Sequence, residues 1–122
     1  MIALFNSQCE LVGWLKDSYD HIFDTDMNWV AYIKNSHVWS ATTGNWCGPI
    51  FGLNCLDQSG KVVAWNPTQR PHGSGRPVKP VRAVKAVRPV RPVRQVRPVR
   101  PVRPVRPLGG WSDLTFSEWV NQ

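Results

Sequence analysis

The side chains best suited to catalysis or metal binding in this sequence are its histidines and cysteines. There are three of each: His21, His37 and His72, and Cys9, Cys47 and Cys55. Two of the histidines open the same motif, a histidine followed by an aliphatic and an aromatic residue, which is typical of a repeated structural position. The cysteines are odd in number and match no Cys-x-x-Cys spacing, so they predict neither a zinc site nor a disulfide framework. We interpret them as small, semi-buried side chains.

Polar residues recur at one position of four short turns. They are Asn6, Asp24, Ser40 and Asp57. Such side chains bond the backbone of their own turn, although four of them around one rim would also form a shallow site. The sequence contains no nucleophile elbow, no HExxH motif and no phosphate-binding glycine loop. We therefore predict a protein that is not an enzyme and that needs no metal or cofactor.

The net charge of +7 over 122 residues is unevenly distributed. Residues 1–69 carry −3, residues 70–106 carry +12 without an acidic residue, and residues 107–122 carry −2. The basic character therefore belongs to one segment, which weakens the usual inference of a nucleic-acid-binding domain. Because no signal peptide and no apolar run of bilayer-spanning length is found, the expected location is the cytoplasm.

Residues 1–66 contain four similar segments, each marked by two kinds of residue. A large apolar residue precedes each polar turn, at Phe5, Phe23, Trp39 and Leu56. A small residue follows each turn, at Gly13, Ala31, Gly48 and Ala64. The first set is spaced by 18, 16 and 17 residues and the second by 18, 17 and 16. One short unit is therefore repeated four times.

Each unit predicts a β-hairpin, because two apolar strands flank a turn rich in Asn, Asp, Ser, Thr and Gly. The expected strands are 3–5 and 11–15, 21–23 and 29–33, 37–39 and 46–50, and 54–56 and 62–65. Cys9 and Met27 stand where two turns have glycine, so their turns must differ or carry strain. Hairpins bury a core only if they close, so we predict an all-β fold, four quasi-symmetric hairpins in a shallow closed barrel or flower.

This repeat pattern resembles the 4-fold β-flower proteins, a bacterial family. The resemblance covers residues 2–67 and 108–121, and its motifs are Phe23-Asp-Thr-Asp, Trp46-Cys-Gly-Pro-Ile, Leu56-Asp-Gln-Ser-Gly-Lys-Val-Val-Ala-Trp-Asn-Pro and Gly110-Trp-Ser-Asp-Leu-Thr-Phe-Ser-Glu-Trp. It implies a shallow symmetric barrel, whose architecture is likened to the phosphoinositide-binding tubby C-terminal domain. It brings no enzymatic activity with it, and a likeness of fold transfers no site.

Residues 77–106 consist of ten triplets of the form Pro/Ala/Gln-Val-Arg/Lys. Frequent proline excludes a continuous helix, and the period of three matches a polyproline II helix. We therefore divide the chain into a four-hairpin domain (1–68), a basic low-complexity linker called the basic arm (69–107), and an aromatic C-terminal docking segment (108–122). The candidate anion contacts in the arm are Arg82, Arg88, Arg91, Arg94, Arg97, Arg100, Arg103 and Arg106.

Several functions fit the basic arm. Binding to nucleic acid or another polyanion would be non-specific, because the cations are sparse beside duplex phosphates and no aromatic residue interleaves them. Attachment to an anionic membrane gains up to about 1 kcal/mol per basic residue. Recognition by an SH3-type module fits its PxxPxR pattern, and a semi-rigid spacer needs no partner at all.

The C-terminal segment predicts a short helix. Thr115 and Glu118 fit a capping box, and Phe116, Trp119 and Val120 then share one face. A helix this short does not hold alone in water, so it docks, either on the open end of the flower or on a membrane or partner. The aromatic residues considered for a docking face are Trp14, Tyr32, Trp65, Trp111, Phe116 and Trp119, of which the first three are expected at equivalent places.

Together these features predict a non-catalytic binding module. The first hypothesis is peripheral interaction with an anionic membrane lipid or a protein partner, through the flower's apolar face and the basic arm. The alternative is non-specific polyanion or nucleic-acid binding through the arm alone. The opposite charges of the two parts also favour an arm that lies on its own acidic domain when no partner is present.

Overall fold

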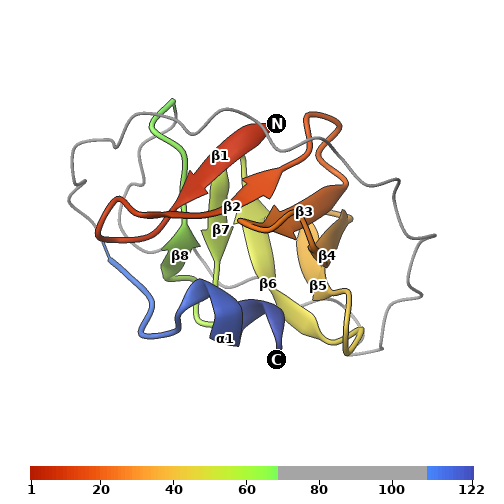
Figure 1. The fold of residues 1–122 in the computed structure, drawn as a ribbon. Coiled ribbons are helices and arrows are strands. Elements are labelled where there is room, and N and C mark those ends of the chain that lie inside the picture. Colours follow the sequence, from red (N-terminus) through yellow and green to blue (C-terminus); the bar gives the residue numbers. More distant parts are fainter. Residues whose placement is uncertain (69–109) are drawn as a thin grey trace.

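The computed structural model describes residues 1–68 and 110–122, so the basic arm and His72 lie outside the described residues. Within these two ranges the chain forms eight strands and one short helix (Figure 1). They are β1 (Ile2–Phe5), β2 (Leu11–Leu15), β3 (His21–Asp24), β4 (Trp29–Lys34), β5 (His37–Ser40), β6 (Trp46–Phe51), β7 (Asn54–Leu56), β8 (Val62–Ala64) and α1 (Phe116–Val120). No helix in the described part is long and apolar enough to cross a bilayer.

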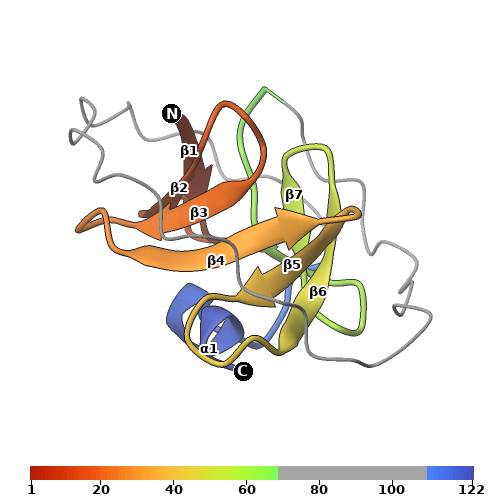
Figure 2. The same ribbon diagram turned by 90° about the vertical axis from the view of Figure 1, so that its right-hand side faces the viewer.

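The strands pair antiparallel in chain order and curve round into a nearly closed barrel (Figure 2). The two ends of the sheet meet at Phe5 and Trp65, whose backbone N–H groups donate to each other's carbonyl oxygens at 2.8 and 3.0 Å. The Asn66 side chain adds a hydrogen bond to the Ala3 carbonyl oxygen at 2.7 Å. This closure removes most of the free strand edge, because the backbone hydrogen-bonding groups at the edge of one hairpin pair with those of its neighbour. The predicted all-β hairpin barrel is therefore confirmed.

All four hairpins share one irregularity in their pairing. Each has a β-bulge directly before its large apolar marker residue. The residue before the bulge is fully buried and pairs with the small marker residue of the second strand; the pairs are Leu4–Gly13, Ile22–Ala31, Val38–Gly48 and Cys55–Ala64. The bulge bends each strand, and the small partners leave room for the four side chains to meet in the core. Both repeat markers are therefore structural positions.

Aromatic pairs seal three of the seams between consecutive hairpins. In each, an aromatic residue near the end of one hairpin lies opposite the apolar marker of the next; the pairs are Trp14–Phe23, Tyr32–Trp39 and Trp65–Phe5. All six side chains are buried. The three aromatic residues expected at equivalent places are therefore confirmed to be so, and their role is to close the ring.

The polar residue that opens each turn bonds the backbone of that turn. A side-chain oxygen accepts from two backbone N–H groups at 2.9–3.2 Å in each of Asn6, Asp24, Ser40 and Asp57, which confirms the predicted role. Gly44 and Gly60 take the left-handed conformation, with φ of 75° and 89°. Cys9 and Met27 take it too, each at φ 62°. Their turns therefore carry the predicted strain, about 1–2 kcal/mol for a residue with a Cβ.

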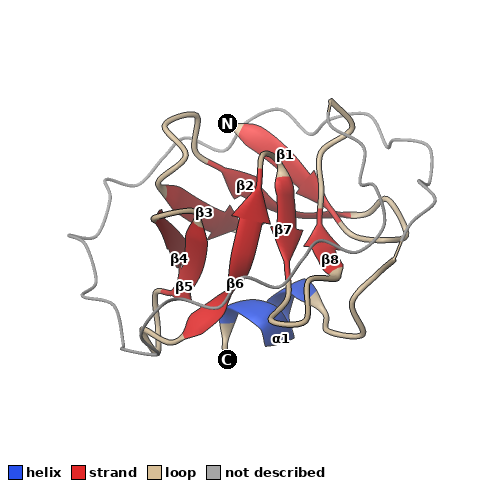
Figure 3. Ribbon diagram, turned by 180° about the vertical axis from the view of Figure 1, so that it is seen from behind, coloured by secondary structure: helices blue, strands red, loops and turns tan. Residues whose placement is uncertain are grey.

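Helix α1 lies across the ends of β6, β7 and β8 (Figure 3). Its Phe116, Trp119 and Val120 side chains are buried in the same cluster as the inward residues of the strands. The Trp119 Nε1–H donates to the carbonyl oxygens of Cys47 on β6, at 3.1 Å, and Leu56 on β7, at 3.0 Å. Of the two docking alternatives, the structure therefore shows the first, since the segment packs on its own barrel.

Two of the small marker residues make room for this packing. A Cβ at Gly13 would stand 2.6 Å from the Phe23 carbonyl oxygen of the neighbouring strand and 2.9 Å from the Phe116 ring, and a Cβ at Gly48 would stand 2.1 Å from the Leu56 carbonyl oxygen. The Leu56 oxygen is the one that accepts from Trp119. Any larger residue at either position would displace the helix or the strand, which explains why these two hairpins have glycine where the others have alanine.

The predicted capping box of α1 is confirmed. The Thr115 side chain accepts from the Glu118 N–H at 3.2 Å, and the Glu118 carboxylate accepts from the Thr115 N–H at 3.0 Å. Hydrogen bonds from the Thr115 backbone and side chain lower the pKa of Glu118. Because a helix of this length is unstable alone, its burial against the barrel holds it in place.

Replacing Trp119 by phenylalanine is expected to lower the free energy of unfolding by about 2–3 kcal/mol. The variant keeps a buried ring but removes the Trp119 donor from two carbonyl oxygens. The Cys47 oxygen keeps a hydrogen bond from the Gln122 side chain at 3.2 Å, so the main loss falls on the Leu56 oxygen, and an unpaired buried acceptor costs about 1–3 kcal/mol. Trp29→Phe is a matched control, because the Trp29 Nε1–H has no partner among the described residues. Urea unfolding measures both, and equal losses would contradict the role given to the Trp119 donor.

Candidate groove beside the C-terminal helix

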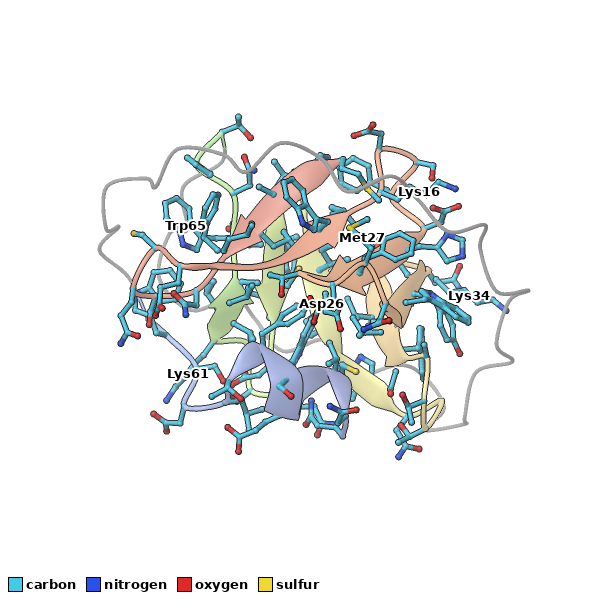
Figure 4. All side chains as sticks on the ribbon, in the orientation of Figure 1. Lys16, Asp26, Met27, Lys34, Lys61 and Trp65 are labelled. Atoms are coloured by element: carbon cyan, nitrogen blue, oxygen red, sulfur yellow. The ribbon has the colours of Figure 1, made fainter. Side chains whose placement is uncertain are left out.

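A groove of about 590 Å³ lies between the first two hairpin turns and the C-terminal segment. One side includes residues 6–8 and residues 24 and 25, and the other includes residues 111–117. Figure 4 shows Asp26, in the second of these turns, on the side of the barrel where α1 lies. Because its two sides are far apart in the sequence, the groove exists only in the folded chain.

The lining of the groove includes both aliphatic and acidic residues. Leu11, Val12 and Val30 contribute partly buried aliphatic surface. Asp24 and Asp113 contribute carboxylates, and no lysine, arginine or histidine of residues 1–68 or 110–122 lines the groove. Neither carboxylate forms an ion pair with another residue of the described ranges. Among the described residues, the groove therefore combines apolar surface with negative charge that no described cation neutralises.

One wall of the groove is the chain that returns from the basic arm. The Val62 N–H donates to the Gly110 carbonyl oxygen at 3.2 Å, and the Ser112 N–H donates to the Val62 carbonyl oxygen at 2.9 Å. The Trp111 ring stands edge-on to the Trp65 ring, with centroids 6.3 Å apart. Strand β8 thus holds the returning chain by backbone pairing before α1 begins.

Asp57 fastens this wall to the fourth hairpin turn. Its Oδ2 accepts from the Ser112 hydroxyl at 2.5 Å, while its Oδ1 accepts from its own turn. Burial opposes ionisation of Asp57, but the hydrogen bonds from Ser112, Ser59 and the Lys61 backbone outweigh it and lower the pKa of the carboxyl. Asp57 therefore stays ionised at neutral pH and holds the Ser112 hydroxyl as a charge-assisted bond.

The aromatic residues considered for a docking face lie mostly inside the barrel. Five are buried, namely Trp14, Tyr32, Trp65, Phe116 and Trp119, and Trp111 is half-buried in the wall of the groove. They do not form an exposed face, because a small domain can bury enough surface only by placing its largest side chains inside. The candidate anion contacts of the basic arm, Arg82, Arg88, Arg91, Arg94, Arg97, Arg100, Arg103 and Arg106, lie outside the described residues.

The two described histidines occupy equivalent packed positions, as the repeat predicts. His21 stands edge-on to Trp29 with ring centroids 5.7 Å apart, and His37 stands edge-on to Trp46 at 5.8 Å. The Trp46 Nε1–H also donates to His37 Nδ1 at 3.2 Å. Burial lowers the pKa of His37. These contacts use the His37 ring in packing between strands β5 and β6.

The three cysteines are free thiols, as expected, but they are buried in the core and not semi-buried as predicted, because all three pack in the hydrophobic clusters of the closed barrel. Burial raises the pKa of the Cys47 thiol to about 12. Burial, together with the neighbouring Cys47, raises that of Cys55 to about 12. Thiols this weakly acidic are poor nucleophiles at neutral pH. The described residues contain no group of three or more His, Cys, Asp or Glu side chains placed to hold a metal ion.

Replacing Ser112 by alanine is expected to lower the free energy of unfolding by about 1–2 kcal/mol at neutral pH, because a hydrogen bond to a carboxylate is lost. The folded pKa of Asp57 lies below its ordinary value, so this contribution is present above about pH 4 and is lost as the pH falls through the folded pKa. The loss measured by urea unfolding should therefore shrink in acid. Ser18→Ala breaks an exposed bond to Asp20, whose pKa is also lowered; as a control it should lose less stability at neutral pH, because solvent screens an exposed bond. A loss independent of pH would contradict the assignment.

The family model described as "4-fold beta flower protein" matches residues 2–120 of this chain. The comparisons with curated proteins and with solved structures found no match to this chain. The matched range contains all eight strands and α1, and the four bulged hairpins supply the fourfold arrangement. The resemblance drawn from the repeat motifs is confirmed, and the chain belongs to the 4-fold beta flower protein family.

Proposed function

We propose that this protein is a non-catalytic binding module that attaches to an anionic membrane surface through its basic arm. The separation of charge along the chain carries the proposal. The described residues hold eight carboxylates and three lysines, a net charge of −5, whereas residues 70–106 hold twelve basic residues and no acidic one. An anionic surface therefore repels the barrel and attracts the arm, which makes the arm the point of attachment.

The composition of the arm favours a membrane over a nucleic acid. Each basic residue near an anionic bilayer contributes about 1 kcal/mol, and the valine of every triplet adds apolar surface that an interface can bury. The arm has no aromatic residue to stack on bases. One cation in three residues is also sparse beside duplex DNA, which carries a phosphate charge about every 1.7 Å. The proposal implies a peripheral protein on the cytoplasmic face of a membrane.

Non-specific binding of nucleic acid or another polyanion by the arm is the second candidate. The same charge of +12 supports it, because Lys and Arg that neutralise phosphates gain affinity by releasing counterions. It differs from the first candidate in the ligand that the arm prefers, since it predicts tighter binding to duplex DNA than to anionic vesicles at equal salt.

Vesicle sedimentation of the full-length chain tests the proposal. The protein should sediment with vesicles of phosphatidylcholine and phosphatidylserine and stay in the supernatant with phosphatidylcholine alone. Because the attraction is screened over about 10 Å at 0.1 M salt, the bound fraction should fall steeply as salt rises.

Two charge variants locate the attachment. The arm-neutral variant replaces all twelve basic residues of 70–106 by glutamine and should lose vesicle binding; the positions are Arg70, Arg76, Lys79, Arg82, Lys85, Arg88, Arg91, Arg94, Arg97, Arg100, Arg103 and Arg106. Replacing Lys16, Lys34 and Lys61 by glutamine removes the cations of the barrel and should leave binding unchanged. Tighter binding to duplex DNA than to vesicles would favour the second candidate, and full binding by the arm-neutral variant would overturn both.

A further inference from the structure

The groove beside α1 and the basic arm have complementary chemistry. The groove has aliphatic surface from Leu11, Val12 and Val30 and carboxylates from Asp24 and Asp113, with no cation among its described lining residues. Each triplet of the arm pairs one valine with one cation, in a strict period of three. A segment with this pattern can place an apolar side chain on the aliphatic surface while its cation approaches a carboxylate.

The chain connectivity brings the arm to the groove. The last triplet ends at Arg106, and Trp111, five residues later, lines the groove. At no more than about 3.6 Å per residue, Arg106 stays within about 18 Å of that ring. The Val62 N–H donates to the Gly110 carbonyl oxygen, so the last triplet ends four residues before a point that is fixed on the barrel. The triplets are therefore present at high effective concentration, which allows weak contacts to be populated.

We propose that the groove is the docking site for Pro-Val-Arg triplets of this chain's own basic arm, with valines against Leu11, Val12 and Val30 and arginines beside Asp24 and Asp113. A docked triplet is withheld from any anionic surface, so the barrel and an outside polyanion compete for the arm. This contact goes beyond the proposed membrane attachment and does not depend on it, because it concerns the arm and the barrel alone.

Heteronuclear NMR of the full-length chain tests the docking. The backbone amides of Gln8, Thr25 and Asp113 and the indole N–H of Trp111 report on the groove. At low salt their chemical shifts should differ between the wild-type chain and the arm-neutral variant, and the difference should vanish at high salt. The amides of the β4–β5 turn, including Asn35, lie outside the groove lining and should not respond.

Two paired variants separate the groove from general electrostatic attraction. Asp24→Asn with Asp113→Asn should abolish the salt-dependent shifts, and the turn should survive because Asn6 fills the equivalent position in the first hairpin. Asp17→Asn with Asp20→Asn removes the same charge outside the groove lining and should leave the shifts in place. Equal effects of the two pairs would overturn the docking site, and so would an absence of shifts at low salt.

Dilution of the wild-type chain decides whether the occupant is in the same molecule. Docking within one chain is independent of protein concentration, so the groove shifts should persist unchanged on dilution. Shifts that disappear on dilution would show that the arm of a second copy fills the groove, which would overturn the proposed occupant. Vesicle binding is not used in this experiment, so its failure leaves the proposed membrane attachment untouched.

Discussion

The barrel depends on one side chain that comes from beyond the basic arm. Trp119 is fully buried, and its indole N–H donates to the carbonyl oxygens of Cys47 and Leu56 on neighbouring strands. Its ring lies in the same buried cluster as the inward residues of all four hairpins. Buried carbonyl groups need donors, and a large ring with one donor supplies both volume and hydrogen bonds. The C-terminal segment is therefore part of the domain core.

The positions that depart from fourfold symmetry lie where the C-terminal segment packs on the barrel. The same bulge and the same pairing of a buried residue with a small one occur in every hairpin. Of the four small marker residues, only Gly13 and Gly48 lack a Cβ, and these two positions contact Phe116 and the Leu56 carbonyl. The groove lies on this asymmetric side, between the first two turns and the returning chain. The four repeated hairpins thus form the barrel, and the two glycines that differ between repeats leave room for the C-terminal segment that lines the groove.

Charge is divided between the two parts in a way that links them. The four-hairpin domain and the C-terminal segment are acidic, and the arm that joins them is strongly basic. Both ends of the arm are anchored, since the first hairpin closes on Trp65 before it and β8 pairs with Gly110 after it. Because both flanks of the arm belong to the acidic barrel, the proposed attraction acts within one chain and does not depend on protein concentration. Attachment to an outside anionic surface must compete with that attraction.

The sequence alone determined the hairpins, their turns and the ring. The nearly equal spacing of large and small residues indicates a backbone geometry that is repeated within each hairpin. The polar turn residues bond the backbone of their own turns, so this signal is local too; they are Asn6, Asp24, Ser40 and Asp57. Strain at Cys9 and Met27 was predictable for the same reason. Only the tertiary structure decided that the aromatic side chains are core and that Asp57 holds Ser112. Those contacts join residues far apart in the chain, and their pairing is set by the volume left inside the closed ring, which no local pattern encodes.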